Sequence, residues 1–167
     1  MTPDMGFADA LRAVNAMKGE GVIEDYAIAG AMAIVFWSEP VPTFDLDVLV
    51  ALPTAPGALV SLNAVVYSWA EARGYPAAEE HIVIEGLPTQ FLPSPTPLAG
   101  EAIAAARDVD YEGVVVRVVP PEYLIALYLQ PEAKTAKRRE RAAMLLELPS
   151  LNRPRLDDIL LRHGLSF

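Results

Sequence analysis

The sequence predicts an α+β fold in which a small mixed β-sheet is packed with helices and followed by a C-terminal helical tail. Short apolar segments typical of strands alternate with segments of helical periodicity, and glycines and prolines separate them. The last part of the chain has helical patterns only. With 167 residues, 53% of them apolar, the chain is long enough for one core. We expect an α/β core at 1–130 and a helical extension of the same domain at 131–167.

The first half of the chain is expected to form two strands and three helices. Apolar residues at a spacing of three to four predict the first helix, and glycines end it. These residues are Phe7, Leu11, Val14 and Met17, followed by Gly19 and Gly21. The next elements are a strand at 26–29, a helix at 30–37, a strand at 43–50 and a helix at 57–73.

The second half begins with a predicted hairpin, in which Gly86 joins strands at 81–85 and 88–92. A helix at 98–107 and a β-branched strand at 114–119 follow. Pro120 and Pro121 suit the first turn of a helix that continues to about residue 129. The tail contains a helix at 132–147 and a last helix from about 152 to 163, with Gly164 as its left-handed stop.

Charge and composition narrow the function classes. The net charge of −9 argues against a general nucleic-acid binder. A basic cluster on the acidic chain suits a phosphate-bearing ligand, and a solvated helix face is an equally weighted alternative. The cluster consists of Lys134, Lys137, Arg138, Arg139 and Arg141.

The absence of cysteine excludes disulfides, cysteine nucleophiles and thiolate metal sites. The first twenty residues do not read as a signal peptide, and the uncharged stretch 26–38 is too short to span a bilayer. We therefore expect a cytoplasmic protein with no membrane partner. The high apolar fraction makes a homodimer a reasonable expectation.

Asp45 and Asp47 are the most informative residues. Alternate residues of a strand face the same way, so both carboxylates project from one face while Leu46 and Val48 fill the other. Two acids held in this way are a ligand pair for a hard divalent cation. The alternative is a solvent-facing strand edge with two unrelated acids, but like charges at this spacing repel.

Gly30 and Ala31 lie between a predicted strand and a predicted helix. A glycine at a helix start lets the backbone approach a phosphate closely, and the free amides and the helix dipole favour the anion. The alternative is a helix that simply begins where the strand ends.

These motifs together resemble the nucleotidyltransferase fold of the polymerase-beta type. The small pair at Gly30-Ala31 precedes Thr43-x-Asp45-x-Asp47, and 84–92 is similar to the hairpin that normally ends in a third acid. The segment 116–126, with Pro-Glu-x-Leu-Ile-Ala at its end, looks like the small bacterial members, which include toxins of abortive-infection and toxin–antitoxin systems.

The resemblance implies transfer of a nucleoside monophosphate from a nucleoside triphosphate to an acceptor hydroxyl, with one or two Mg²⁺ ions. RNA, a protein or a small molecule are the open acceptors. It implies Asp45 and Asp47 as catalytic and metal-binding residues. The nucleotide would be bound by Gly30, Ala31, Thr43, Gln90, Lys134 and Lys137.

The sequence departs from the family pattern at several positions. Gln90 replaces the third acid, and an amide oxygen can ligate a metal but is a poor base. Glu85 is a second, weaker candidate for the missing acid. Val41 and Tyr128 stand where an arginine and a lysine are common. These changes leave a rival hypothesis, a catalytically impaired binding module or toxin–antitoxin component with an antitoxin-type partner.

Two further interpretations complete the expectations. His81 and His163 have no ligand spacing and are interpreted as structural residues. A plain structural domain without a ligand is the third and weakest alternative.

Overall fold

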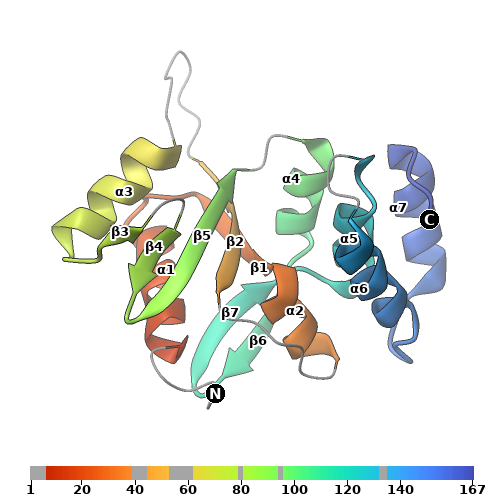
Figure 1. Cartoon of the computed structure of the whole chain (residues 1–167), viewed down its shortest axis with the longest axis horizontal. Helices are drawn as coiled ribbons and strands as arrows, with labels where there is room; N and C mark the ends of the chain where they lie inside the picture. Colours follow the sequence, from red (N-terminus) through yellow and green to blue (C-terminus); the bar gives the residue numbers. More distant parts are fainter. Residues whose placement is uncertain (1–6, 39–44, 53–61, 79–80, 94–95, 132–134) are drawn as a thin grey trace.

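The computed structural model describes residues 7–38, 45–52, 62–78, 81–93, 96–131 and 135–167. Its strands are β1 (Asp25–Ala29), β2 (Leu46–Ala51), β3 (Ala77–Ala78), β4 (His81–Ile84), β5 (Leu87–Pro93), β6 (Arg107–Tyr111) and β7 (Val114–Val118). They form one sheet in the order β3-β4-β5-β2-β1-β7-β6 (Figure 1). The pairs β2–β5 and β1–β7 are parallel and the other neighbours are antiparallel. The predicted α+β fold with a mixed sheet is confirmed.

The described helices are α1 (Phe7–Gly19), α2 (Gly30–Trp37), α3 (Leu62–Ala72), α4 (Pro97–Ala104), α5 (Pro121–Tyr128), α6 (Ala136–Leu146) and α7 (Arg153–His163). The last two helices form the C-terminal tail beside α5 (Figure 1). None of the helices described is long and apolar enough to cross a membrane.

The two faces of the sheet carry different helices. On one face, the Tyr26 hydroxyl donates a hydrogen bond to Asn15 of α1 at 2.5 Å. On the other face, the Arg117 guanidinium donates to the carbonyl of Ile103 in α4 at 2.9 Å. Alternate residues of a strand face opposite ways, so Ala29, three residues after Tyr26, faces away from α1. Asp47 is paired with Ala29 and therefore lies on the α4 face.

Two Glu-Gly turns shape the sheet. Glu85-Gly86 and Glu112-Gly113 each have positive φ at both residues, 51° and 82° in the first and 49° and 85° in the second. This is the backbone of a two-residue hairpin turn whose twist matches that of the strands. The first turn joins β4 to β5 as predicted, and the second joins β6 to β7.

The strand β6 was not predicted. The helix expected at 98–107 ends at Ala104, and Arg107–Tyr111 pair with β7 instead. The short strand β3 at the other edge was also missed. In β6 the acids Asp108 and Asp110 are exposed on an edge strand, where charged residues are tolerated and reduce the hydrophobic signal.

A buried carboxylate holds the C-terminal helices in place. Glu122 in the first turn of α5 is fully buried. It accepts hydrogen bonds from Arg107 Nη2 at 3.3 Å and from the backbone N–H of Asn152 at 3.4 Å. The start of a helix favours negative charge, so Glu122 ties α5 both to β6 and to the start of α7.

The other end of α7 is tied to α4. Arg162 donates to Glu101 at 2.6 Å, and His163 contacts the same carboxylate. Burial raises the pKa of Glu101, but these two partners outweigh it and the pKa lies below its usual range. Between its two anchors α7 packs on α5, and α5 packs on α6, the helix that carries the basic residues from Lys137 to Arg141.

Candidate functional site

A tight bend joins β1 to α2. Gly30 begins α2 with φ of 63°, in the left-handed region that favours glycine. The N-cap residue Ala29 has no side-chain cap, and no acid occupies the first turn of α2. The first-turn amides and the positive end of the helix dipole are therefore not satisfied from within this helix.

Asp47 packs directly against this bend. Ala29 and Asp47 are register partners in the antiparallel pair β1–β2. A Cβ at Gly30 would overlap Oδ2 of Asp47 and would lie 3.1 Å from its Cβ and Cγ. Gly30 is thus required twice, for its backbone conformation and for the space that the Asp47 carboxylate occupies.

The two aspartates lie close together on the α4 face. Asp45 immediately precedes β2 and is half exposed, and Asp47 is the second residue of the strand. Burial raises the pKa of Asp47, and the negative charge of Asp45 raises it further. Two neighbouring carboxylates that repel in this way favour the approach of a cation.

Arginines of α6 supply positive charge to the same place. Arg138 and Arg141 both lower the pKa of Asp47, which places them within electrostatic range of it. Both also oppose the rise in the pKa of Tyr128 that burial causes. The Tyr128 hydroxyl is buried, and the charge of Asp47 raises its pKa further. Tyr128 and the two arginines therefore lie within electrostatic range of Asp47.

The structure brings Gln90 next to Asp47. The parallel strands β2 and β5 pair Asp47 with Gln90 and Leu46 with Thr89. Neighbours in register on adjacent strands project from the same face, so the Gln90 side chain lies on the side of Asp47. An uncharged amide thus stands beside the acidic pair.

Sequence reasoning left His81 out of the site, and the structure places it there. Its Nε2 is 3.5 Å from Oδ2 of Asp45. The predicted hairpin contained the information that places His81 near the acids. The pairing of Ile82 with Thr89, continued by one residue, puts His81 opposite Gln90. Hairpin register therefore identifies a residue that ligand spacing along the chain does not.

The other site residues predicted from the sequence differ in whether the structure describes them and in where it places them. Thr43 and Lys134 lie outside the described residues. Ala31 is buried in the first turn of α2. Lys137 is exposed on α6, but the α6 cations that act on Asp47 are its neighbour Arg138 and Arg141. The sequence included Arg138 and Arg141 in the basic cluster but selected Lys134 and Lys137 as the nucleotide-binding residues.

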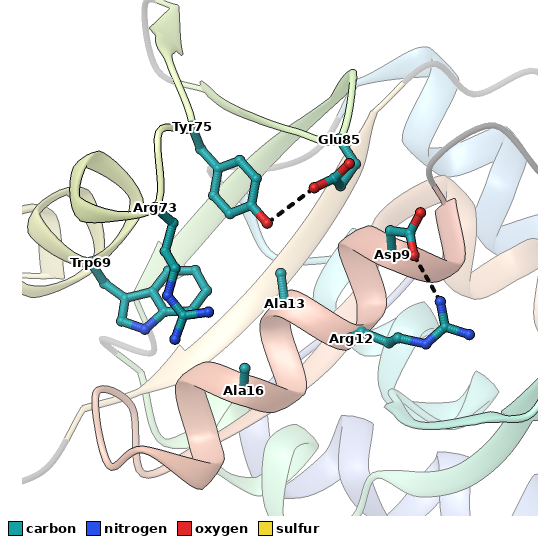
Figure 2. A pocket seen from close by; sticks show the side chains of 8 residues that line it. All are labelled: Asp9, Arg12, Ala13, Ala16, Trp69, Arg73, Tyr75 and Glu85. Carbon is teal, nitrogen blue, oxygen red and sulfur yellow. Dashed lines mark hydrogen bonds and ion pairs between the residues drawn. The ribbon is translucent and has the colours of Figure 1, made fainter.

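Glu85 faces another surface. It lies in the turn between β4 and β5, and the Tyr75 hydroxyl donates to it at 3.2 Å. Both line a hollow of about 430 Å³, together with residues of α1 and with Trp69 and Arg73 of the α3 region. Figure 2 shows these side chains. The suggestion that Glu85 replaces the missing acid is therefore wrong.

The described residues contain no preassembled group of three histidine, aspartate or glutamate side chains for a metal ion. Mg²⁺ is commonly bound by one or two carboxylates together with substrate phosphates. Asp45 and Asp47 suit such a partial site, because they provide hard oxygen donors beside the first turn of α2, which its N-cap residue does not cap. The arrangement can bind a cation and the phosphates of one ligand side by side.

The fold is that of nucleotidyltransferase-like proteins. An antigenic nucleotidyltransferase-like protein from Paracoccidioides brasiliensis matches 96% of this chain and 88% of its own, with a TM-score of 0.59 and 13% identity. ANT(2")-Ia in complex with adenylyl-2"-tobramycin matches 94% of this chain and 96% of its own, with a TM-score of 0.56 and 17% identity. The solution structure of the antibiotic-resistance factor ANT(2'')-Ia gives a TM-score of 0.53 at 16% identity, covering 94% and 90%. No family model and no curated protein sequence matches the chain.

We predict that Gly30→Ala destabilises the protein by about 2 kcal/mol or more, because it combines a left-handed backbone with a clash against Asp47. The measurement is urea unfolding. Gly100→Ala is the control, since Gly100 lies in α4 with no atom within 4 Å of an added Cβ, and it should stabilise by about 0.5–1 kcal/mol. Equal effects of the two substitutions would contradict the close packing at Gly30.

We predict that Asp47→Asn stabilises the ligand-free protein at pH 7. The folded-state pKa of Asp47 lies above its ordinary value of 3.8, so its charged form costs stability once the pH exceeds the folded pKa. The gain should vanish as the pH falls through that pKa to below 3.8.

Chemical unfolding between pH 3 and 7 measures this gain. The control is Asp157→Asn on the exposed side of α7, which should show little change across the range. A loss of stability at pH 7 in Asp47→Asn would refute the unfavourable environment of this carboxylate.

Proposed function

We propose that this chain is a Mg²⁺-dependent nucleotidyltransferase that transfers a nucleoside monophosphate from a nucleoside triphosphate to an acceptor hydroxyl. The observation that carries the proposal is the packing of the Asp47 carboxylate against the Gly30 bend. It puts an acid that suits a cation beside amides that suit a phosphate. The fold shared with nucleotidyltransferase-like structures supports the same class of activity.

The proposal gives each candidate residue a role, including Thr43 and Lys134, which lie outside the described residues. Gly30 and Ala31 present first-turn amides to the phosphates, with Thr43 and the basic helix as further nucleotide contacts. Arg138 and Arg141 neutralise phosphate charge from α6, together with Lys134 and Lys137. Asp45 and Asp47 would hold Mg²⁺, which would supply Lewis-acid chemistry at the phosphate oxygens and the attacking hydroxyl.

In this reaction the protein must mainly position the reactants and neutralise the charge of the phosphates. The acceptor oxygen forms a bond to the α-phosphorus, and the bond from this phosphorus to the pyrophosphate oxygen breaks. The proton of the hydroxyl passes to solvent water. Gln90 stands where a carboxylate would receive it, and an amide is not a base at neutral pH.

The acceptor is an open part of the proposal. ANT(2")-Ia was solved with adenylyl-2"-tobramycin, a small molecule carrying an adenylyl group. A small-molecule hydroxyl is thus one acceptor class for this chain, beside an RNA or a protein hydroxyl. The composition suits a cytoplasmic enzyme.

Gln90 favours a second candidate function. A nucleotidyltransferase-fold module that binds nucleotide without efficient transfer would keep the Asp pair and lose the base. Such a module would act through a protein partner, including the antitoxin-type partner of a toxin–antitoxin pair or a second copy of the chain. The two functions share nucleotide binding and differ in turnover.

We predict that Asp45→Asn/Asp47→Asn lowers Mg²⁺-dependent affinity for a nucleoside triphosphate by about tenfold or more, because the cation loses both carboxylates. Isothermal titration with and without Mg²⁺ measures the affinity. The control is Asp157→Asn/Asp158→Asn, which makes the same charge change on two acids of α7 that are exposed. Equal affinity of the Asp45/Asp47 variant and the wild type would remove the metal site from the proposal.

We predict that Gln90→Asp raises the rate of nucleotide transfer by about 100-fold, since a positioned general base contributes about that factor or more. Transfer of radiolabelled nucleotide to added RNA, protein and aminoglycoside acceptors measures the rate. Gln90→Asn is the control, because it has the size of aspartate and no charge. Efficient transfer by the wild type, unchanged in Gln90→Asp, would eliminate the binding-module alternative.

A further inference from the structure

His81 shares a face with the residues of the candidate site. It begins β4 and lies opposite Gln90 when the register of β4 and β5 is continued by one residue. Gln90 is itself paired with Asp47. The His81 Nε2 lies 3.5 Å from Oδ2 of Asp45. His81 is thus the nitrogen donor of a group that also contains two carboxylates and an amide.

The Nε2 atom of His81 is buried and makes no hydrogen bond within the described part of the chain. Buried polar atoms in folded proteins almost always have a hydrogen-bond partner, and exceptions indicate a water, an ion or a functional role. The nearby Asp45 is half exposed and offers an oxygen at a distance too long for a good hydrogen bond. The His81 nitrogen and the Asp45 oxygen are therefore close enough for both to contact one ion.

We propose that His81 is a nitrogen ligand of the cation held by Asp45 and Asp47, in place of the carboxylate that Gln90 lacks. The inference rests on the proposed function, because it assigns a further ligand to the same cation. It makes the site selective, since imidazole favours transition metals over Mg²⁺, which prefers oxygen donors. Mn²⁺ is then bound in preference to Mg²⁺.

The distance between His81 Nε2 and Asp45 Oδ2 permits both atoms to contact one ion. A metal at about 2.1 Å from each of two donors allows them to be up to about 4.2 Å apart, and His81 Nε2 and Asp45 Oδ2 are 3.5 Å apart. Asp47 is two strands from His81, and its pKa responds to the charges of both His81 and Asp45.

The test uses Mn²⁺ with inorganic tripolyphosphate, a probe that contains no nitrogen. Electron spin-echo spectroscopy of bound Mn²⁺ detects a directly coordinated imidazole nitrogen through its nuclear coupling. The chain has only two histidines, so labelling histidine with ¹⁵N changes the coupling if either is a ligand. His163→Gln is the matched control, because His163 contacts Glu101.

We expect the coupling in wild type and His163→Gln and its loss in His81→Gln. Titration should show the Mn²⁺ dissociation constant of His81→Gln raised by about tenfold, with Mg²⁺ affinity changed less than about twofold. His81→Glu should reverse the preference towards Mg²⁺ by restoring a third carboxylate, which a purely structural role of His81 would not do.

The outcomes separate the two proposals. Mn²⁺ binding that depends on Asp45 and Asp47 but shows no histidine coupling would overturn the role of His81 and leave the proposed function intact. Absence of Asp-dependent binding of either cation, with and without tripolyphosphate, would overturn both. Equal losses of Mn²⁺ and Mg²⁺ affinity in His81→Gln, with no reversal in His81→Glu, would also refute the selectivity.

Discussion

The contact between the Asp47 carboxylate and the Cα of Gly30 constrains the rest of the site. The register Ala29–Asp47 brings the two strands together at the point where β1 ends, and the absence of a Cβ at Gly30 leaves room for the acid. The left-handed backbone of Gly30 then sets the direction in which α2 leaves the sheet. Gly30 provides both the space for the Asp47 carboxylate and the bend that begins α2. This carboxylate therefore lies beside the first turn of α2.

The C-terminal helices supply positive charge to the candidate site. Arg138 and Arg141 come from α6, yet they act on Asp47 in the middle of the sheet. The position of α6 depends on α5, which Glu122 ties to β6 and to the start of α7. The segment expected as an extension at 131–167 therefore contributes charges to the site.

The sequence predicted features that depend on neighbours along the chain. The order of the main elements, the hairpin at Gly86 and the Asp45-x-Asp47 pattern all follow from local periodicity and turn residues. It missed β6, although Glu112-Gly113 repeats the pair found at Glu85-Gly86, because acids on the edge strand masked its pattern. His81, which joins the site through sheet register, was not assigned, since its distance from the acids depends on tertiary structure.

The charged residues around Asp47 favour the binding of a cation together with phosphates. Asp45 and Asp47 bring two negative charges, and Arg138 and Arg141 bring two positive charges within range of Asp47. With Gln90 neutral, these four residues offer a free cation little net attraction. A triphosphate adds several negative charges, which the arginines and the amides of α2 can bind while its oxygens complete the coordination of the cation. This set of residues therefore suits a cation–nucleotide complex better than either component alone, which is consistent with a site that is not preassembled for a metal.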